Sequence, residues 1–167
     1  MEKILDVAQF VYSEFLKLTS ETIDEMKLHK LLYFAQRESL AITNKPLFEE
    51  EMQGWIHGPV SPLVRGYFLQ EVGIYHDTKP IQIESERILK NVIAEYGHVS
   101  SWKLRELSHQ EISWIRSREG LKPHERGNKP LKIDDIREDA KKVRPFDSTW
   151  GMYYDEFPDS ENEGEWF

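Results

Sequence analysis

The sequence predicts a mainly α-helical protein: a single compact domain with a small antiparallel strand element and an acidic C-terminal tail. Apolar residues recur at helical spacing over most of the chain, whereas only residues 48–57 and 81–83 favour short strands. The last 21 residues, 147–167, hold seven acidic residues and no lysine or arginine. We therefore expect a helical domain over residues 1–145 and an acidic, aromatic tail over residues 146–167.

The first two helices are predicted from apolar spacing and from the residues that begin and end helices. An amphipathic helix is expected over residues 3–18. A second helix is expected over residues 26–42, preceded by a capping box of Thr22 and Glu25. Asn44 should end this second helix, because asparagine tolerates the left-handed conformation that closes many helices.

The second helix is predicted to have one apolar and one polar face. Its apolar face consists of Leu28, Leu31, Leu32 and Ala35. Lys27, Lys30 and Arg37 are expected on the opposite face, where they would meet water or a partner.

Further helices are predicted in the second half of the domain. They are expected over residues 62–70, 84–96, 101–107, 108–120 and 133–143. Ser61 should cap the first of these, with Pro62 at its first helical position. Ser108 and Glu111 form a second predicted capping box, and Gly120 ends the helix that follows it.

The stretch "GWIHGPVSP", residues 54–62, crowds two glycines and two prolines into nine positions. We interpret Trp55 as the end of a short strand. Gly58 and Pro59 are then the corner that leads from this strand into the Ser61-capped helix. Their predicted role is conformational and not catalytic.

Composition restricts the class of protein. The chain has no cysteine, which excludes disulfides and cysteine-bound zinc and fits a reducing cytoplasm. Outside the tail, 22 basic and 23 acidic residues nearly balance, which argues against binding to a nucleic-acid backbone. The apolar runs are too short to cross a bilayer, and the N-terminal residues do not resemble a signal peptide. We expect a cytoplasmic protein that binds neither membrane nor nucleic acid.

The titratable residues offer little catalytic or metal chemistry. None of the six histidines has the i, i+4 spacing of a helical zinc site, and we expect no metal and no cofactor. The run of Glu49, Glu50 and Glu51 is expected to be a solvated turn, since side chains along a strand alternate between its faces. His109 and Glu111 could form an acid–base pair, but helix capping is the preferred interpretation.

The aromatic residues divide between the domain and the tail. Trp55, Trp102 and Trp114 are expected in the core, because aromatic side chains contribute much buried area. The tail aromatics lie among acids, without helical or strand period, and are candidates for contacts with a partner. The proposed partner-binding residues are Trp150, Tyr153, Tyr154, Asp155, Glu156 and Phe157.

Several motifs, taken together, resemble the Panacea family of SocA-like domains. They are "KLHKLLYFAQ" at residues 27–36, "PLF" at 46–48, "HGPV" at 57–60 and "LRELSHQEISW" at 104–114. The resemblance covers about residues 5–145. The family signature, with a structural or binding role, corresponds here to Lys27, Lys30, Tyr33, Trp55, Gly58, Pro59, His109 and Trp114.

The resemblance implies a mostly helical antitoxin of prophages and bacterial defence loci, without enzymatic activity. Such a domain neutralises a cognate toxin, encoded by the adjacent gene, by binding it directly. One member of the family also delivers its toxin to a protease, so a proteolytic adaptor is the alternative. A small hydrolase that uses His109 and Glu111, with help from His57, is the enzyme alternative.

Overall fold

A computed structural model of the chain describes residues 1–143. In chain order the described elements are α1 (Ile4–Thr19), α2 (Glu25–Thr43), β1 (Gln53–Trp55), β2 (Gly58–Val60), α3 (Pro62–Tyr67), β3 (Phe68–Leu69), β4 (Gly73–Ile74), α4 (Ile83–Tyr96), α5 (Ser101–Ser108), α6 (Ile112–Ser117) and α7 (Ile133–Ala140). Helices dominate, and the strands form two short antiparallel pairs, β1–β2 and β3–β4. The predicted fold class is therefore confirmed.

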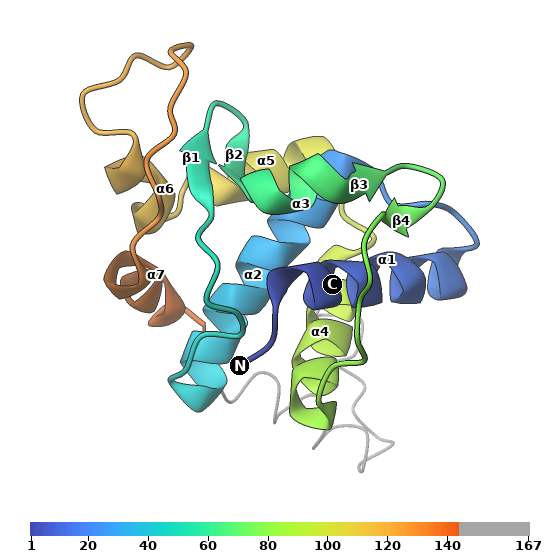
Figure 1. The fold of residues 1–167 in the computed structure, drawn as a ribbon. Helices are drawn as coiled ribbons and strands as arrows, with labels where there is room; N and C mark the ends of the chain where they lie inside the picture. The colour runs from blue at the N-terminus through green and yellow to red at the C-terminus, as the bar shows by residue number, and fades with distance from the viewer. Residues whose placement is uncertain (144–167) are drawn as a thin grey trace, which may run out of the picture.

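Helix α2 is the centre around which the other elements pack. In Figure 1 it crosses the middle of the molecule, with α6 and α7 on one side and α1 and α4 on the other. Every residue from Leu28 to Leu40 is buried. The predicted polar face of this helix is wrong for Lys30 and Arg37, which are only 1% and 8% exposed. A helix that is covered on all sides has no solvent face, whatever its residue pattern.

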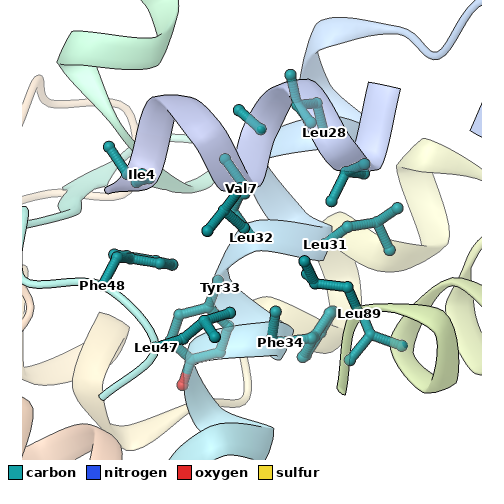
Figure 2. Close-up of a cluster of buried hydrophobic side chains, with 14 of the residues drawn as sticks. Ile4, Val7, Leu28, Leu31, Leu32, Tyr33, Phe34, Leu47, Phe48 and Leu89 are labelled. Carbon is teal, nitrogen blue, oxygen red and sulfur yellow. The ribbon is translucent and has the colours of Figure 1, made fainter. Parts of the chain in front are cut away.

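The hydrophobic core lies where α1 and α4 meet α2. Figure 2 shows Ile4 and Val7 of α1 facing Leu31 and Leu32 of α2, with Phe48 beside them. The buried apolar residues of α1 are Ile4, Val7, Ala8, Val11, Tyr12 and Phe15. These residues follow the predicted helical spacing. Leu18, near the end of α1, also fits this spacing but is 63% exposed.

The β1–β2 hairpin replaces the predicted strand and corner. Gly58 and Pro59 belong to the second strand, where Gly58 pairs with Trp55 and Pro59 with Gly54. The chain reverses through the two residues between the strands, 56 and 57, and Gly58 has a φ of 114°. A positive φ of this kind is accessible to glycine at little cost.

The helix boundaries confirm some predicted caps and correct others. Asn44 is left-handed at the end of α2, and the Ser61 side chain accepts a hydrogen bond from Val64 N–H at the start of α3. The predicted box of Thr22 and Glu25 is wrong, because the carboxylate of Asp24 caps α2 by accepting from Lys27 N–H.

Other predictions in the second half of the chain also need correction. Ile83 begins α4 and is not in a strand, and α3 ends at Tyr67, followed by the short strands β3 and β4. The second capping box is wrong, because Ser108 Oγ donates to the carbonyl of Arg105 inside α5. Glu111 precedes α6 but makes no side-chain capping bond there.

Candidate functional site

A pocket of about 820 Å³ opens beside the β1–β2 hairpin. Glu25, His29 and Lys30 of α2 contribute to its lining, together with residues 55–57 of the hairpin. Arg65 of α3 and residues 126–128 of the loop before α7 also line it, together with Met26 and Val60. A volume of this size is in the range of ordinary ligand pockets, about 300–1,000 Å³.

Lys30 brings α2 and the hairpin into close contact. Its ammonium donates to the carbonyl of Pro59 at 3.2 Å. A Cβ at Gly58 would lie 2.7 Å from Lys30 Cε and 2.5 Å from Ser108 Oγ, so only glycine fits there. Burial, and then the nearby charge of Arg105, lower the pKa of Lys30 from 10.5 to about 7. Lys30 of the first motif and Gly58 and Pro59 of the third, which are far apart in the sequence, are therefore in direct contact.

His29 and Glu25 form a polar wall of the pocket. His29 Nδ1 accepts from Ser61 N–H at 3.2 Å, so its proton lies on Nε2, which donates to Glu25 at 3.1 Å. Burial lowers the pKa of His29, although the bond to Glu25 opposes this effect. The Glu25 carboxylate also pairs with Arg65, whose guanidinium lies 5.6 Å from the centroid of the Trp55 ring. The hydrogen bond from His29 is the main reason why the pKa of Glu25 is lowered.

An exposed aromatic patch, which we call the Trp102 patch, consists of His57, Trp102 and Arg105. Trp102 is 57% exposed, so the prediction that it belongs to the core is wrong. The Arg105 guanidinium lies 4.5 Å from the centroid of the indole, and Arg105 Nε donates to His57 Nδ1 at 2.9 Å. Trp102 lies at the second position of the short helix α5, where the core side is taken by Leu104. The indole is therefore held outward by stacking with an arginine.

His109 and Trp114 form a stack that supports the hairpin. Their ring centroids are 3.9 Å apart with an interplanar angle of 11°, and Trp114 Nε1 donates to the carbonyl of Trp55. Burial, then the charge of Arg105, lower the pKa of His109 to about 4, so the ring is neutral at pH 7. Both Trp114 and Trp55 are half-buried and not in the core as predicted.

The hydroxyl of Tyr33 joins α2 to the elements at the other end of the domain. It lies 2.9 Å from Glu111 Oε2 and from Asp139 Oδ2, and 3.0 Å from Ser113 Oγ. Arg37 donates to the other oxygen of Glu111 at 2.7 Å. Burial and the two carboxylates raise the pKa of Tyr33 well above 10. This buried network ties α6 and α7 to α2.

The network also engages Glu111, so that it does not pair with His109 as the enzyme alternative requires. Both carboxylate oxygens of Glu111 are engaged, by Arg37 and Tyr33, and no hydrogen bond joins His109 to Glu111 in the described structure. Burial raises the pKa of Glu111, whereas Arg37 opposes the rise. In Asp139, burial is outweighed by hydrogen bonds from Ser113, so its pKa is lowered. The sequence pattern predicts Arg37 on the polar face of the second helix and offers no signal for Asp139, because both pair with residues that are far away in the chain.

The predicted site residues thus fall into distinct places. Lys30 and Trp55 line the pocket, Gly58 and Pro59 pack against Lys30, and Tyr33 belongs to the buried network. Lys27 donates to the carbonyl of Gly97 at 2.8 Å, at the C-terminal end of α4. The six tail candidates, residues 150 and 153–157, lie outside the described residues.

Within residues 1–143, no group of three or more His, Asp or Glu side chains is arranged to hold a metal ion. No helix in that same range combines the length and apolar character needed to traverse a membrane.

Glu50, from the acidic run, accepts a hydrogen bond from the Ile4 backbone N–H at 3.2 Å. It therefore helps to fix the start of α1.

Comparison with known proteins identifies the family. The model described as "Antitoxin SocA-like, Panacea domain" matches residues 28–115, slightly more than half of the chain. The chain belongs to the SocA-like Panacea family. No curated protein and no solved structure gives a significant match.

The Panacea match runs from α2 into α6 and therefore contains the hairpin, α3 and α5. It includes Lys30, the Trp102 patch and the stack of His109 on Trp114. Helices α1 and α7 lie outside the match, although Asp139 of α7 contacts Tyr33 within it. At the level of the family, the match supports a role in toxin–antitoxin biology.

Proposed function

We propose that this Panacea protein neutralises a cognate toxin by binding it directly, on the face formed by the Trp102 patch and the neighbouring pocket. The observation that carries this proposal is Trp102, which is 57% exposed and stacked with Arg105. Tryptophan and arginine dominate the energetic centres of protein interfaces. An exposed indole of this kind adds little to the stability of the free domain and offers a large, rigid contact to a partner.

The pocket adds shape to this face. His57 belongs to the Trp102 patch and also lines the pocket, so the two are continuous. The stack of His109 on Trp114 and the bond from Trp114 to the carbonyl of Trp55 hold the hairpin in position. A surface that is rigid before binding loses less conformational entropy when a partner binds.

We extend the proposal to the tail, residues 146–167, as a second contact region. Its seven acids would meet a basic surface of the toxin, and Trp150, Tyr153, Tyr154 and Phe157 would fill pockets there. Asp155 and Glu156 lie between these aromatics and would provide charge. The proposed partner is the product of the adjacent gene.

Co-expression with the adjacent gene product, scored by host growth and by co-purification, tests the proposal. We expect the unaltered chain to restore growth and to form a complex, and Trp102→Ala to lose both. Tyr75→Ala is the matched control, because Tyr75 is also an exposed aromatic, at 71%, but it follows β4 and belongs neither to the Trp102 patch nor to the pocket lining. Equal rescue by the two variants would place the interface elsewhere.

The same cells distinguish blockade from proteolytic delivery. Direct neutralisation leaves the half-life of the toxin unchanged or lengthens it. A shorter half-life, accompanied by growth rescue without a stable complex, would favour the adaptor alternative. Rescue by Trp102→Ala at wild-type level, with a complex that still forms, would refute the role of the patch while leaving direct binding intact.

A further inference from the structure

The floor of the pocket holds a buried ammonium group with few partners. Lys30 is 1% exposed, and its Nζ, which carries three N–H groups when charged, donates to one carbonyl, that of Pro59. In the described part of the chain Lys30 forms no salt bridge. Fully buried lysines are rare unless they are paired, because burying an unpaired charge is costly. Packing alone does not explain this residue, since methionine would supply a similar stem.

The surrounding charges leave the pocket positive. Among its described lining residues Glu25 is the one carboxylate, and it is engaged by His29 and by Arg65. Neither Lys30 nor Arg126 forms a salt bridge with Glu25, although the charges of Asp24 and Glu25 partly oppose the lowering of the Lys30 pKa by burial and Arg105. The pocket is therefore electrostatically matched to an anion.

The remaining lining is apolar. It consists of Met26, Trp55, Ile56 and Val60, of which Val60 is only 8% exposed. A site of about 820 Å³ is larger than one carboxylate requires, so the ligand must also fill apolar space. The chemistry that fits is a carboxylate next to an apolar or aromatic group.

We propose that this pocket receives an acidic side chain of the protein partner, Asp or Glu, whose carboxylate pairs with the Lys30 ammonium while an adjacent apolar side chain packs on Trp55. The proposal rests on the proposed function, because the toxin is the partner that presents this segment. A charge-assisted hydrogen bond in a site shielded from water is stronger than a neutral one. The lysine supplies selectivity for the acid, and the apolar walls supply contact area.

The protonation state of Lys30 is compatible with such a role. With a pKa of about 7, about half of the molecules carry the ammonium at neutral pH. Entry of a carboxylate stabilises the charged form, and the additional proton comes from solvent. Release of the proton from Lys30 thus limits the cost of burying this residue in the empty pocket, and the bound carboxylate keeps Lys30 protonated.

The test uses the full chain and two peptide probes, N-acetyl-Phe-Asp-amide and N-acetyl-Phe-Asn-amide, which differ in one charge. Binding is followed by the NMR signals of the Trp55 indole N–H and of the ¹⁵N-labelled Lys30 amino group. We expect the Asp peptide to shift both signals and the Asn peptide to bind at least about tenfold more weakly. Equal binding of the two peptides, or no binding of either, would overturn the proposal.

Two matched variants locate the selectivity. Lys30→Met should abolish the preference for the Asp peptide, whereas Lys27→Met, one turn earlier on α2 and directed at Gly97, should keep it. Persistence of the preference in Lys30→Met would refute the assignment. The comparison of the two peptides on the unaltered chain does not depend on either variant folding.

A chain that lacks residues 147–167 identifies a competing occupant. If the Asp peptide binds only to this shortened chain, the acidic tail of the protein itself fills the pocket, and the proposal for the partner is wrong. Growth rescue and a stable complex without peptide selectivity would refute this inference while the proposed function stands. Peptide selectivity at Lys30 without rescue would refute the proposed function, since the acid site would then serve another partner.

Discussion

Lys30 should give the protein a stability that rises with pH, and Lys30→Met should remove this rise. The pKa of Lys30 falls from 10.5 in a solvated chain to about 7 in the folded protein. Below pH 7 both states carry the proton, so the full cost of the buried charge is present. Between pH 7 and 10.5 the folded state releases the proton while the unfolded state retains it, so the free energy of unfolding increases.

The size of the effect follows from the two pKa values. Each pH unit in this window contributes about 1.4 kcal/mol at most, and between pH 7 and pH 9 the rise amounts to about 2 kcal/mol. Burial and neighbouring charges lower the pKa values of His29, His57 and His109 below 6.5, so these groups titrate outside the window. Lys30 is therefore expected to dominate the slope there.

Urea denaturation followed by tryptophan fluorescence at pH 7, 8 and 9 measures this slope. The unaltered chain and Lys27→Met should both gain stability with pH, whereas Lys30→Met should give a flat profile. Parallel profiles for the unaltered chain and Lys30→Met would show that Lys30 is not held near neutrality, and the reasoning about its burial would fail.

Five further changes have defined outcomes. Tyr33→Phe should lower the free energy of unfolding by about 1–3 kcal/mol in urea, because two buried carboxylates lose a shared hydroxyl; an unchanged midpoint would contradict the network. Gly58→Ala should lower the free energy of unfolding by about 2 kcal/mol or more, because Gly58 has a φ of 114° and close neighbours. Gly66→Ala should raise it by about 0.5–1 kcal/mol, because Gly66 lies in α3 with open space where the added Cβ would lie. Trp102→Ala should change stability by less than about 0.5 kcal/mol yet abolish toxin neutralisation; large destabilisation would mean a structural role. Deletion of residues 147–167 should weaken the toxin complex in a pull-down without altering the unfolding midpoint, and unchanged affinity would confine the interface to the domain.

Much of the fold could be predicted because its signals are local. The left-handed Asn44 and the Ser61–Pro62 start of α3 depend on backbone preferences and on a side chain three residues away. Helical periodicity placed α1, α2 and α4 to within a residue or two. The family could also be predicted, because its motifs are short stretches that can be recognised directly in the sequence. For the candidate site, the sequence marked Lys30, Trp55 and Gly58 as signature residues but did not indicate that they surround one pocket.

What the sequence alone determined was therefore the order of the helices, the family, and the acidic character of the tail. Only the tertiary structure decided which residues are buried. Lys30 and Arg37 look like solvent-facing residues of an amphipathic helix, yet α2 is covered on all sides, and Trp102 looks like a core residue, yet α5 turns it outward. Glu111 looks like a cap, yet it binds Tyr33 and Arg37, far away in the chain. Burial and pairing depend on which elements pack around a residue, and this is a property of distant segments that no local pattern encodes.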